Sequence, residues 1–122
     1  MVLMKFDFET WLIDVADLII KKRSSLATGS LSEAERAVEC MWLIDYSVRN
    51  SGSFGVLKDI DSTAFSDLKS AANDAQLIKL AAWLDQSNNE ERFCSTYYER
   101  FDEPCAELKN FFDRSVRSKI AS

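Results

Sequence analysis

Few residues in this sequence could carry chemistry. It contains no histidine, which removes the commonest general base and a common transition-metal ligand. Two carboxylate pairs occur at helical spacing, Asp14 with Asp17 and Glu99 with Asp102, and such pairs on facing helices could bind Mg²⁺. The first pair falls on a polar helix stripe, and Asp102 stands where it can cap a helix. We therefore expect no catalytic residue, no metal site and no cofactor.

The cysteines do not form a recognisable site. Cys40, Cys94 and Cys105 cannot all pair within the chain, and none belongs to a CxxC motif. We interpret them as buried thiols in a reducing compartment. The N-terminus lacks a basic region before an apolar run, so we expect no signal peptide and a cytoplasmic location.

Asp45 is the polar residue that stands out, because it falls among Val38, Met41 and Val48 on the apolar face of a predicted helix. A buried carboxylate needs hydrogen-bond donors. The nearest candidates are Arg49 and the free backbone N–H groups of the turn at residues 50–55. Two interpretations stay open: Asp45 stabilises that turn, or it forms a polar pocket for a partner.

The same helix is predicted to end in the stretch YSVRNSGSF. A helix end commonly uses a residue with positive φ to satisfy its last carbonyl groups. Asn50 or Gly52 can adopt that conformation at little cost. We therefore predict a structural turn that depends on Asp45, Asn50 and Gly52.

Candidate partner contacts lie on two predicted helices. Glu35 and Glu39 are candidates on the polar face of the second helix, which also carries Tyr46, and the candidate Glu33 stands in its first turn. Trp83 falls beside Gln76 and Lys79, away from the apolar face of its own helix. It either covers a neighbouring helix or, if exposed, serves as a contact anchor, since tryptophan is enriched among interface hot spots.

The elements that must position these residues are all predicted to be helices. Glycine and proline are scarce, with three and one, and no run alternates long enough for a strand. The first helix is apolar most of the way round, which predicts a central position. Ser32 and Glu35 form a capping box at the start of the second helix. The predicted helices span residues 8–26, 32–49 and 64–73, with a short turn of helix at 56–60. A fourth helix carries Leu77 to Leu84, and a further segment contains Phe93 to Phe101. Asp102 caps the last helix.

Composition places the chain among globular proteins. Its 122 residues are 47% hydrophobic and 29% charged, which predicts a single all-α domain over 1–122, a bundle of five to six helices. The net charge of −5 disfavours direct binding to nucleic acid and suits a basic protein partner. The stretch WLIDVADLII is too short and too polar to span a membrane.

The run LSEAERAVECMWLIDYSVRNSGSF resembles a family of small bacterial helical proteins whose best-known members are DNA mimics. Ser32, Glu35 and Arg36 match the family's helix opening, and Asp45, Val48, Asn50 and Gly52 match its close. Ser47, Arg49 and Ser51 depart from the pattern, and Phe54 comes one residue late. The resemblance implies an all-α fold and, for the best-known members, DNA mimicry.

We therefore expect a non-enzymatic protein that binds another protein. In the mimic version, Glu33, Glu35 and Glu39 occupy the basic groove of a DNA-binding protein. The alternative is an immunity or antitoxin protein that blocks a toxin. A third hypothesis is a metal-dependent enzyme built on carboxylates.

Overall fold

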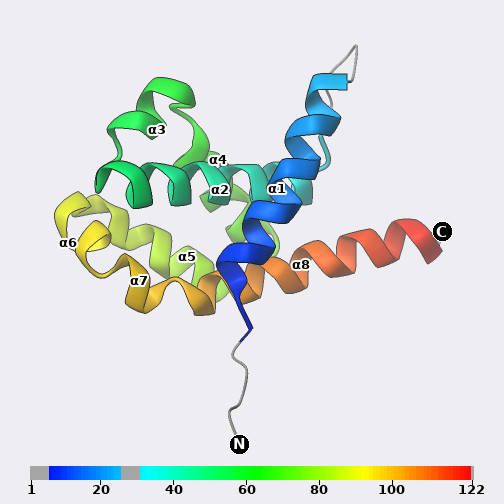
Figure 1. The fold of residues 1–122 in the computed structure, drawn as a ribbon. Helices are drawn as coiled ribbons and strands as arrows, with labels where there is room; N and C mark the ends of the chain where they lie inside the picture. Colours follow the sequence, from blue (N-terminus) through cyan, green and yellow to red (C-terminus); the bar gives the residue numbers. More distant parts are fainter. Residues whose placement is uncertain (1–5, 26–30, 122) are drawn as a thin grey trace, which may run out of the picture.

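The computed structural model of the chain describes residues 6–25 and 31–121. These residues contain no strand and are 85% helical, which confirms the all-α prediction (Figure 1). They form eight α-helices and one 3₁₀ helix. In chain order the elements are α1 Phe8–Ser25, α2 Glu33–Ser51, α3 Gly55–Ile60, α4 Ala64–Asp74, α5 Ile78–Asp85, η1 Gln86–Asn88, α6 Glu90–Ser95, α7 Tyr97–Arg100 and α8 Asp102–Ala121.

The helix count exceeds the predicted five or six because short helices replace two segments that the periodicity left ill-defined. The stretch at 56–60 is a six-residue helix, α3. The segment from Phe93 to Phe101 is broken at Thr96, whose backbone leaves the helical region between α6 and α7. The Thr96 hydroxyl donates to the Arg92 carbonyl at 2.8 Å, a local bond that competes with helix continuation. The predicted end of the first helix, at Leu26, lies outside the described residues.

The capping box at the start of α2 is confirmed. The Ser32 hydroxyl accepts from the Glu35 backbone N–H at 3.1 Å, and the Glu35 carboxylate accepts from the Ser32 N–H at 2.9 Å. Asn89 caps α6 by accepting from the Arg92 N–H. The side chain that caps α5 comes from a distant part of the sequence. Glu107 of α8 accepts from the backbone N–H groups of Lys79 and Leu80, a placement that also favours its negative charge.

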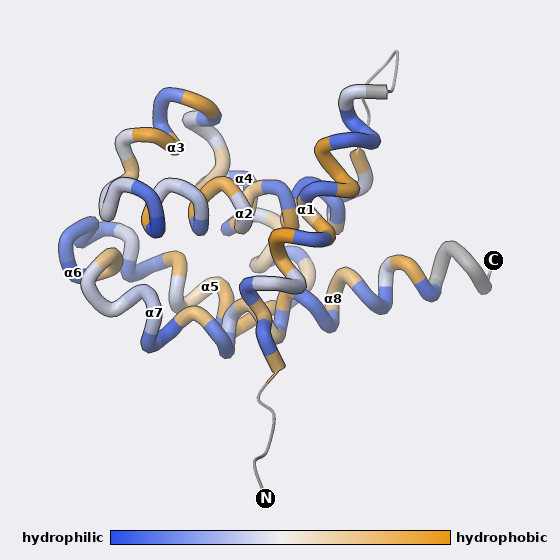
Figure 2. The backbone as a smooth tube through the Cα atoms, in the orientation of Figure 1, coloured by the Kyte–Doolittle hydropathy of each residue, from blue (hydrophilic) through white to orange (hydrophobic). Residues whose placement is uncertain are grey.

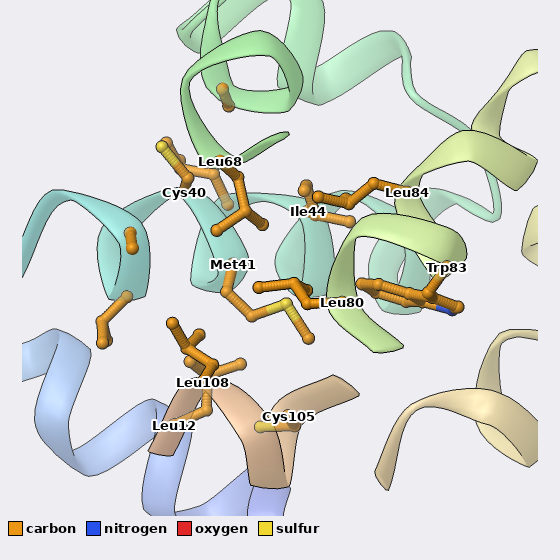
Figure 3. Close-up of a cluster of buried hydrophobic side chains, with 14 of the residues drawn as sticks. Leu12, Cys40, Met41, Ile44, Leu68, Leu80, Trp83, Leu84, Cys105 and Leu108 are labelled. Atoms are coloured by element: carbon orange, nitrogen blue, oxygen red, sulfur yellow. The ribbon is translucent and has the colours of Figure 1, made fainter. Parts of the chain in front are cut away.

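The central helix is α2, and the prediction that the first helix would be central is wrong. α2 packs on α1, α3, α4 and α8. Its small buried residues Ala34, Ala37 and Cys40 allow close approach. Met41 and Ile44 of α2 lie among Leu12, Leu80, Leu84 and Leu108 of three other helices (Figure 3). By contrast, α1 leaves Ile13 and Leu18 exposed, the latter at 66%, because neighbours cover only one of its faces.

An aromatic cluster runs along the other side of the core. Phe93 contacts Phe54, Phe65, Trp83 and Tyr97, with ring centroids 4.8–6.0 Å apart. Tyr97 continues the cluster to Phe101 at 5.4 Å. These rings hold the short helices α3, α6 and α7, which bury too little surface to be stable by themselves.

The last helix, α8, has two different halves. Pro104, Cys105 and Leu108 are buried in the first half, whereas the second half extends beyond the other helices (Figure 1). Hydrophobic and hydrophilic residues alternate along it (Figure 2). Within the described ranges, no helix combines the length and the apolarity needed to cross a membrane.

Candidate functional site

Asp45 is buried, as its position on the apolar face of α2 predicted, and it is 3% exposed. Its Oδ1 accepts from Arg49 Nε and from the Tyr97 hydroxyl, each at 2.6 Å. Arg49 also pairs with Glu9 of α1. These side chains form what we term the Asp45 cluster (Glu9, Asp45, Arg49 and Tyr97), which joins α1, α2 and α7.

Aromatic rings enclose the Arg49 guanidinium. Its central carbon lies 4.7 Å from the ring centroid of Tyr98, 5.2 Å from that of Phe101 and 5.5 Å from that of Tyr97. Such cation–π contacts add to the ion pair. The arrangement stabilises helix packing, and the hollow beside it is lined by Arg49 itself and by the Glu9 that neutralises it.

The prediction that Asp45 stabilises the turn after α2 is wrong, because the hydrogen-bond donors expected from that turn do not contact Asp45. Arg49 was correctly expected, but the backbone of residues 50–55 donates nothing to Asp45 in the structure. Ser47 has that role instead. Its hydroxyl donates to the Ser53 carbonyl at 2.6 Å and accepts from the Leu57 N–H at 3.2 Å. Asp45 points from α2 toward α7, so its oxygen meets Tyr97 rather than the reversing chain.

Gly52 adopts the positive φ predicted for this turn, at 66°. Its N–H donates to the Val48 carbonyl at 2.8 Å, which satisfies one of the last carbonyls of α2. Asn50 does not take that role, because it remains helical and its side-chain amide donates to the Tyr46 carbonyl. The turn is therefore set by Gly52 and Ser47.

Burial changes the acid–base properties of this region. Burial and the neighbouring Asp45 charge raise the pKa of Tyr97 well above its usual value. Burial also raises the pKa of the Cys40 thiol to about 12. For Arg49, burial works to lower the pKa, but the hydrogen bond and charge of Asp45 outweigh it and raise the pKa. At neutral pH, Tyr97 and Cys40 are therefore protonated.

Of the three glutamates predicted to contact a partner, two are used internally. Both Glu35 oxygens accept from Lys22, at 2.9 and 2.8 Å. Glu39 is buried and accepts from Arg23 and Arg36. Glu33 alone stays exposed. Glu35 and Glu39 are thus neutralised by cations of the same chain, so they do not present free negative charge to a basic groove.

Arg36 is the centre of a larger ion network. Its guanidinium donates to Glu39, Asp61 and Asp67 at 2.7–3.2 Å and also to Thr63. This network ties α2 to the connection between α3 and α4. Ser32, Glu35 and Arg36, the opening of the family-like run, therefore all have structural contacts here.

Trp83 is not an exposed anchor, because it is 4% exposed. Its ring packs against Phe93 at 4.8 Å and Tyr97 at 5.6 Å. This placement agrees with the alternative in which Trp83 covers a neighbouring helix. The wheel of its own short helix could not show this, since α6 and α7 supply the rings it meets.

A residue of α2 that the sequence did not single out is Trp42, which is half-buried. Trp42 stacks on Tyr46 at 5.4 Å, and Tyr46 is exposed. Trp42 also lines a hollow of about 390 Å³, the Trp42 hollow. Its apolar lining residues are Ile20, Trp42, Leu43 and Ile60, and its polar ones are Arg23, Arg36, Glu39, Asp61 and Thr63.

The composition of the Trp42 hollow suits contact with another molecule. Ile60 is 59% exposed at its edge, and the half-buried Trp42 offers an aromatic surface. The charged rim is already paired internally, by Arg23 with Glu39 and by Arg36 with Asp61. A signal for this site was present in the sequence, because Trp42 precedes Tyr46 by one helical turn.

The carboxylate pairs do not come together into a larger cluster. Asp14 and Asp17 are exposed on α1, and Asp17 pairs with Lys21. Among the described residues, no group of three or more histidine, cysteine or acidic side chains could hold a metal ion. The pairs themselves are explained by solvation and by helix starts.

Comparisons with protein-family models, with curated proteins and with solved structures gave no match. The resemblance of residues 31–54 to the family that includes DNA mimics therefore stays a prediction.

Proposed function

We propose that this chain is a non-enzymatic protein-binding protein whose contact surface is the Trp42 hollow together with Tyr46. The observation that carries the proposal is that the half-buried Trp42 and the exposed Ile60 line one concavity, and that the exposed Tyr46 stacks on Trp42. Large apolar side chains gathered on one surface commonly mark interaction sites, and aromatic residues dominate interface hot spots.

The geometry favours an apolar contact over charge mimicry. A DNA mimic must display free carboxylates, whereas Glu35 and Glu39 are paired with Lys22, Arg23 and Arg36. The Arg23–Glu39 and Arg36–Asp61 pairs instead give the hollow a polar rim whose charges are balanced. Such a rim resembles protein interfaces, in which a desolvated apolar centre is surrounded by polar groups.

The test is affinity capture from the source cells with quantitative mass spectrometry. The wild-type chain is compared with Trp42→Ala and Ile60→Ser, and far-UV circular dichroism verifies that both variants are folded. Ile78→Ser is the matched control, because Ile78 is 75% exposed on α5 and lies outside the Trp42 hollow. A specific partner should be captured by the wild type and by Ile78→Ser and lost with the other two variants.

Salt dependence separates the proposal from DNA mimicry. Exposed charge pairs weaken strongly with added salt, since screening shortens their range, whereas apolar contact persists. We expect capture to survive high salt. Capture that disappears at high salt, or that Trp42→Ala leaves unchanged, would refute the Trp42 hollow as the contact surface.

A further inference from the structure

A second concavity is lined by a residue whose polar group has no hydrogen-bond partner among the described residues. Trp83 is 4% exposed, and the described part of the chain offers its indole N–H no hydrogen bond. Yet none of the buried side-chain polar atoms there lacks a partner. The indole N–H must therefore reach the surface, and its nitrogen lies on the side of the ring turned away from Leu80 and Met41 (Figure 3).

Trp83 lines a hollow of about 360 Å³, the Trp83 hollow, which is formed by residues of α5, α7 and the start of α8. Besides Trp83, its lining includes two cations, Lys79 and Arg100, and two carboxylates, Glu99 and Glu103. The volume is in the range of small-molecule sites, which combine an apolar floor with a few convergent polar groups. Ala82, Trp83 and Pro104 supply its apolar part.

These charged groups are available to a ligand. Arg100 makes no ion pair within the described residues, and Gln86 holds one of its nitrogens at 2.9 Å, which orients the guanidinium. Glu99 has no hydrogen-bond or ion-pair partner in the same part of the chain. Lys79 and Glu103 are 3.7 Å apart and largely exposed, a weak contact that a ligand can replace.

We propose that the Trp83 hollow binds a free α-amino acid in its zwitterionic form. A carboxylate would accept from the indole N–H of Trp83 and from Arg100, whose planar fork matches carboxylate geometry. The ammonium group would be paired with Glu99. The two cations and two carboxylates of the lining sum to zero charge, which suits the α-ammonium and α-carboxylate groups of an amino acid, together neutral, better than a phosphate dianion.

An adjoining hollow indicates which side chain is favoured. It shares Gln86 and Arg100 with the Trp83 hollow and adds Asn88 and Arg92. Arg92 also lacks an ion-pair partner among the described side chains. Within this hollow Asp85 is paired with Lys69 at 2.5 Å, so the free charge is positive. A second carboxylate would be stabilised there, and acidic amino acids are the expected ligands.

The test follows the indole N–H resonances of the ¹⁵N-labelled full chain during titration. The Trp83 resonance is assigned with Trp83→Phe, and Trp11 and Trp42 serve as internal references. L-glutamate should shift the Trp83 resonance saturably and leave the other two in place. We expect L-glutamate to bind with a Kd of about 1 mM or below. N-acetyl-L-glutamate, which lacks the ammonium group, should bind roughly tenfold more weakly. Inorganic phosphate should bind more weakly still.

Two variants assign the roles of the charges. Arg100→Gln should weaken L-glutamate binding roughly tenfold or more, whereas Arg114→Gln, which removes an exposed arginine of α8, should leave it unchanged. Glu99→Gln should make the affinities for L-glutamate and N-acetyl-L-glutamate equal. Absence of a saturable Trp83 shift, a phosphate response as strong as that of L-glutamate, or an unaltered Arg100→Gln variant would each overturn the proposal.

Discussion

At the residue scale, the Asp45 cluster shows how a buried charge is accommodated. Asp45 Oδ1 accepts from Arg49 and from Tyr97, and Arg49 is further balanced by Glu9. No buried side-chain polar atom of the described residues is without a partner. An isolated carboxylate would be costly to bury, but a paired and hydrogen-bonded one is tolerated. The cluster thus fixes the packing of three helices.

Replacing Asp45 should therefore be costly even far from any binding surface. We expect Asp45→Ala to lower the free energy of unfolding by about 2–4 kcal/mol, because it leaves the Tyr97 hydroxyl and part of Arg49 unpaired. Asp45→Asn should cost less, since the amide oxygen still accepts from Tyr97. Urea denaturation measures both variants, and an Asp45→Ala variant as stable as the wild type would contradict the argument.

Gln76 has a positive φ, a backbone conformation that is unfavourable for residues other than glycine. It lies just after the end of α4 and has a φ of 58°. The Leu77 N–H donates to the Ala72 carbonyl, and the Gln76 N–H donates to the Asn73 carbonyl. These are the hydrogen bonds of a Schellman motif. Gln76→Gly should raise the free energy of unfolding by about 0.5–1 kcal/mol, because glycine adopts this region without strain.

The reverse change at a similar position, Gly52→Ala, should lower the free energy of unfolding by about 1 kcal/mol. Thermal melts that show both substitutions shifting stability in the same direction would refute the reasoning.

At the element scale, Ser47 couples the end of α2 to the start of α3. Its hydroxyl bridges the Ser53 carbonyl and the Leu57 N–H, both of which come from the turn or the helix that follows. The same turn is also contacted from α6, because Glu90 accepts from the Phe54 N–H. Short helices such as α3 depend on contacts of this kind, since six residues cannot stabilise a helix alone.

Ser47→Ala should open the turn that Asp45 was expected to hold. We predict a loss of about 1–3 kcal/mol, the cost of leaving a buried donor unsatisfied, and faster hydrogen exchange at the Leu57 amide. Asp45→Asn is the control, because it should leave exchange at Leu57 unchanged relative to global stability. The opposite pattern, with Leu57 sensitive to Asp45→Asn and not to Ser47→Ala, would restore the role first predicted for Asp45.

At the scale of the whole molecule, buried protonated groups couple folding to pH. The pKa of Cys40 is raised to about 12 and that of Tyr97 lies well above its usual value. In the unfolded chain these groups ionise near pH 8.5 and 10, roughly. Because the folded-state pKa values are higher, the stability they contribute is complete below the unfolded values and is lost as pH rises.

We therefore expect the free energy of unfolding to fall progressively above about pH 9. Tyr97→Phe should remove the part of this decrease that begins near pH 10, roughly, after allowance for its lower baseline. Denaturation series between neutral and alkaline pH measure the effect. A stability that stays constant or rises over this interval would show that neither group is buried in its protonated form.

The sequence by itself determined the helical class, several helix limits and the burial of Asp45. Those features depend on residues close in the chain: the Ser32–Glu35 capping box, Gly52 after α2, and the spacing of apolar residues around Asp45. Local geometry fixes such features because a helix places neighbours three and four residues apart on one face. This is why the end of α2 could be located to within two residues, at Arg49 from the sequence and at Ser51 in the structure.

Only the tertiary structure decided which partners these residues meet. Tyr97 lies 52 positions after Asp45, and Glu107 caps α5 from 27 positions away. Helix periodicity gives the direction of a side chain but not the element that packs against it, so Trp83 and Glu39 could not be assigned to the interior. The central position of α2 was missed for the same reason. The distribution of apolar residues around a helix does not show how many other helices pack against it.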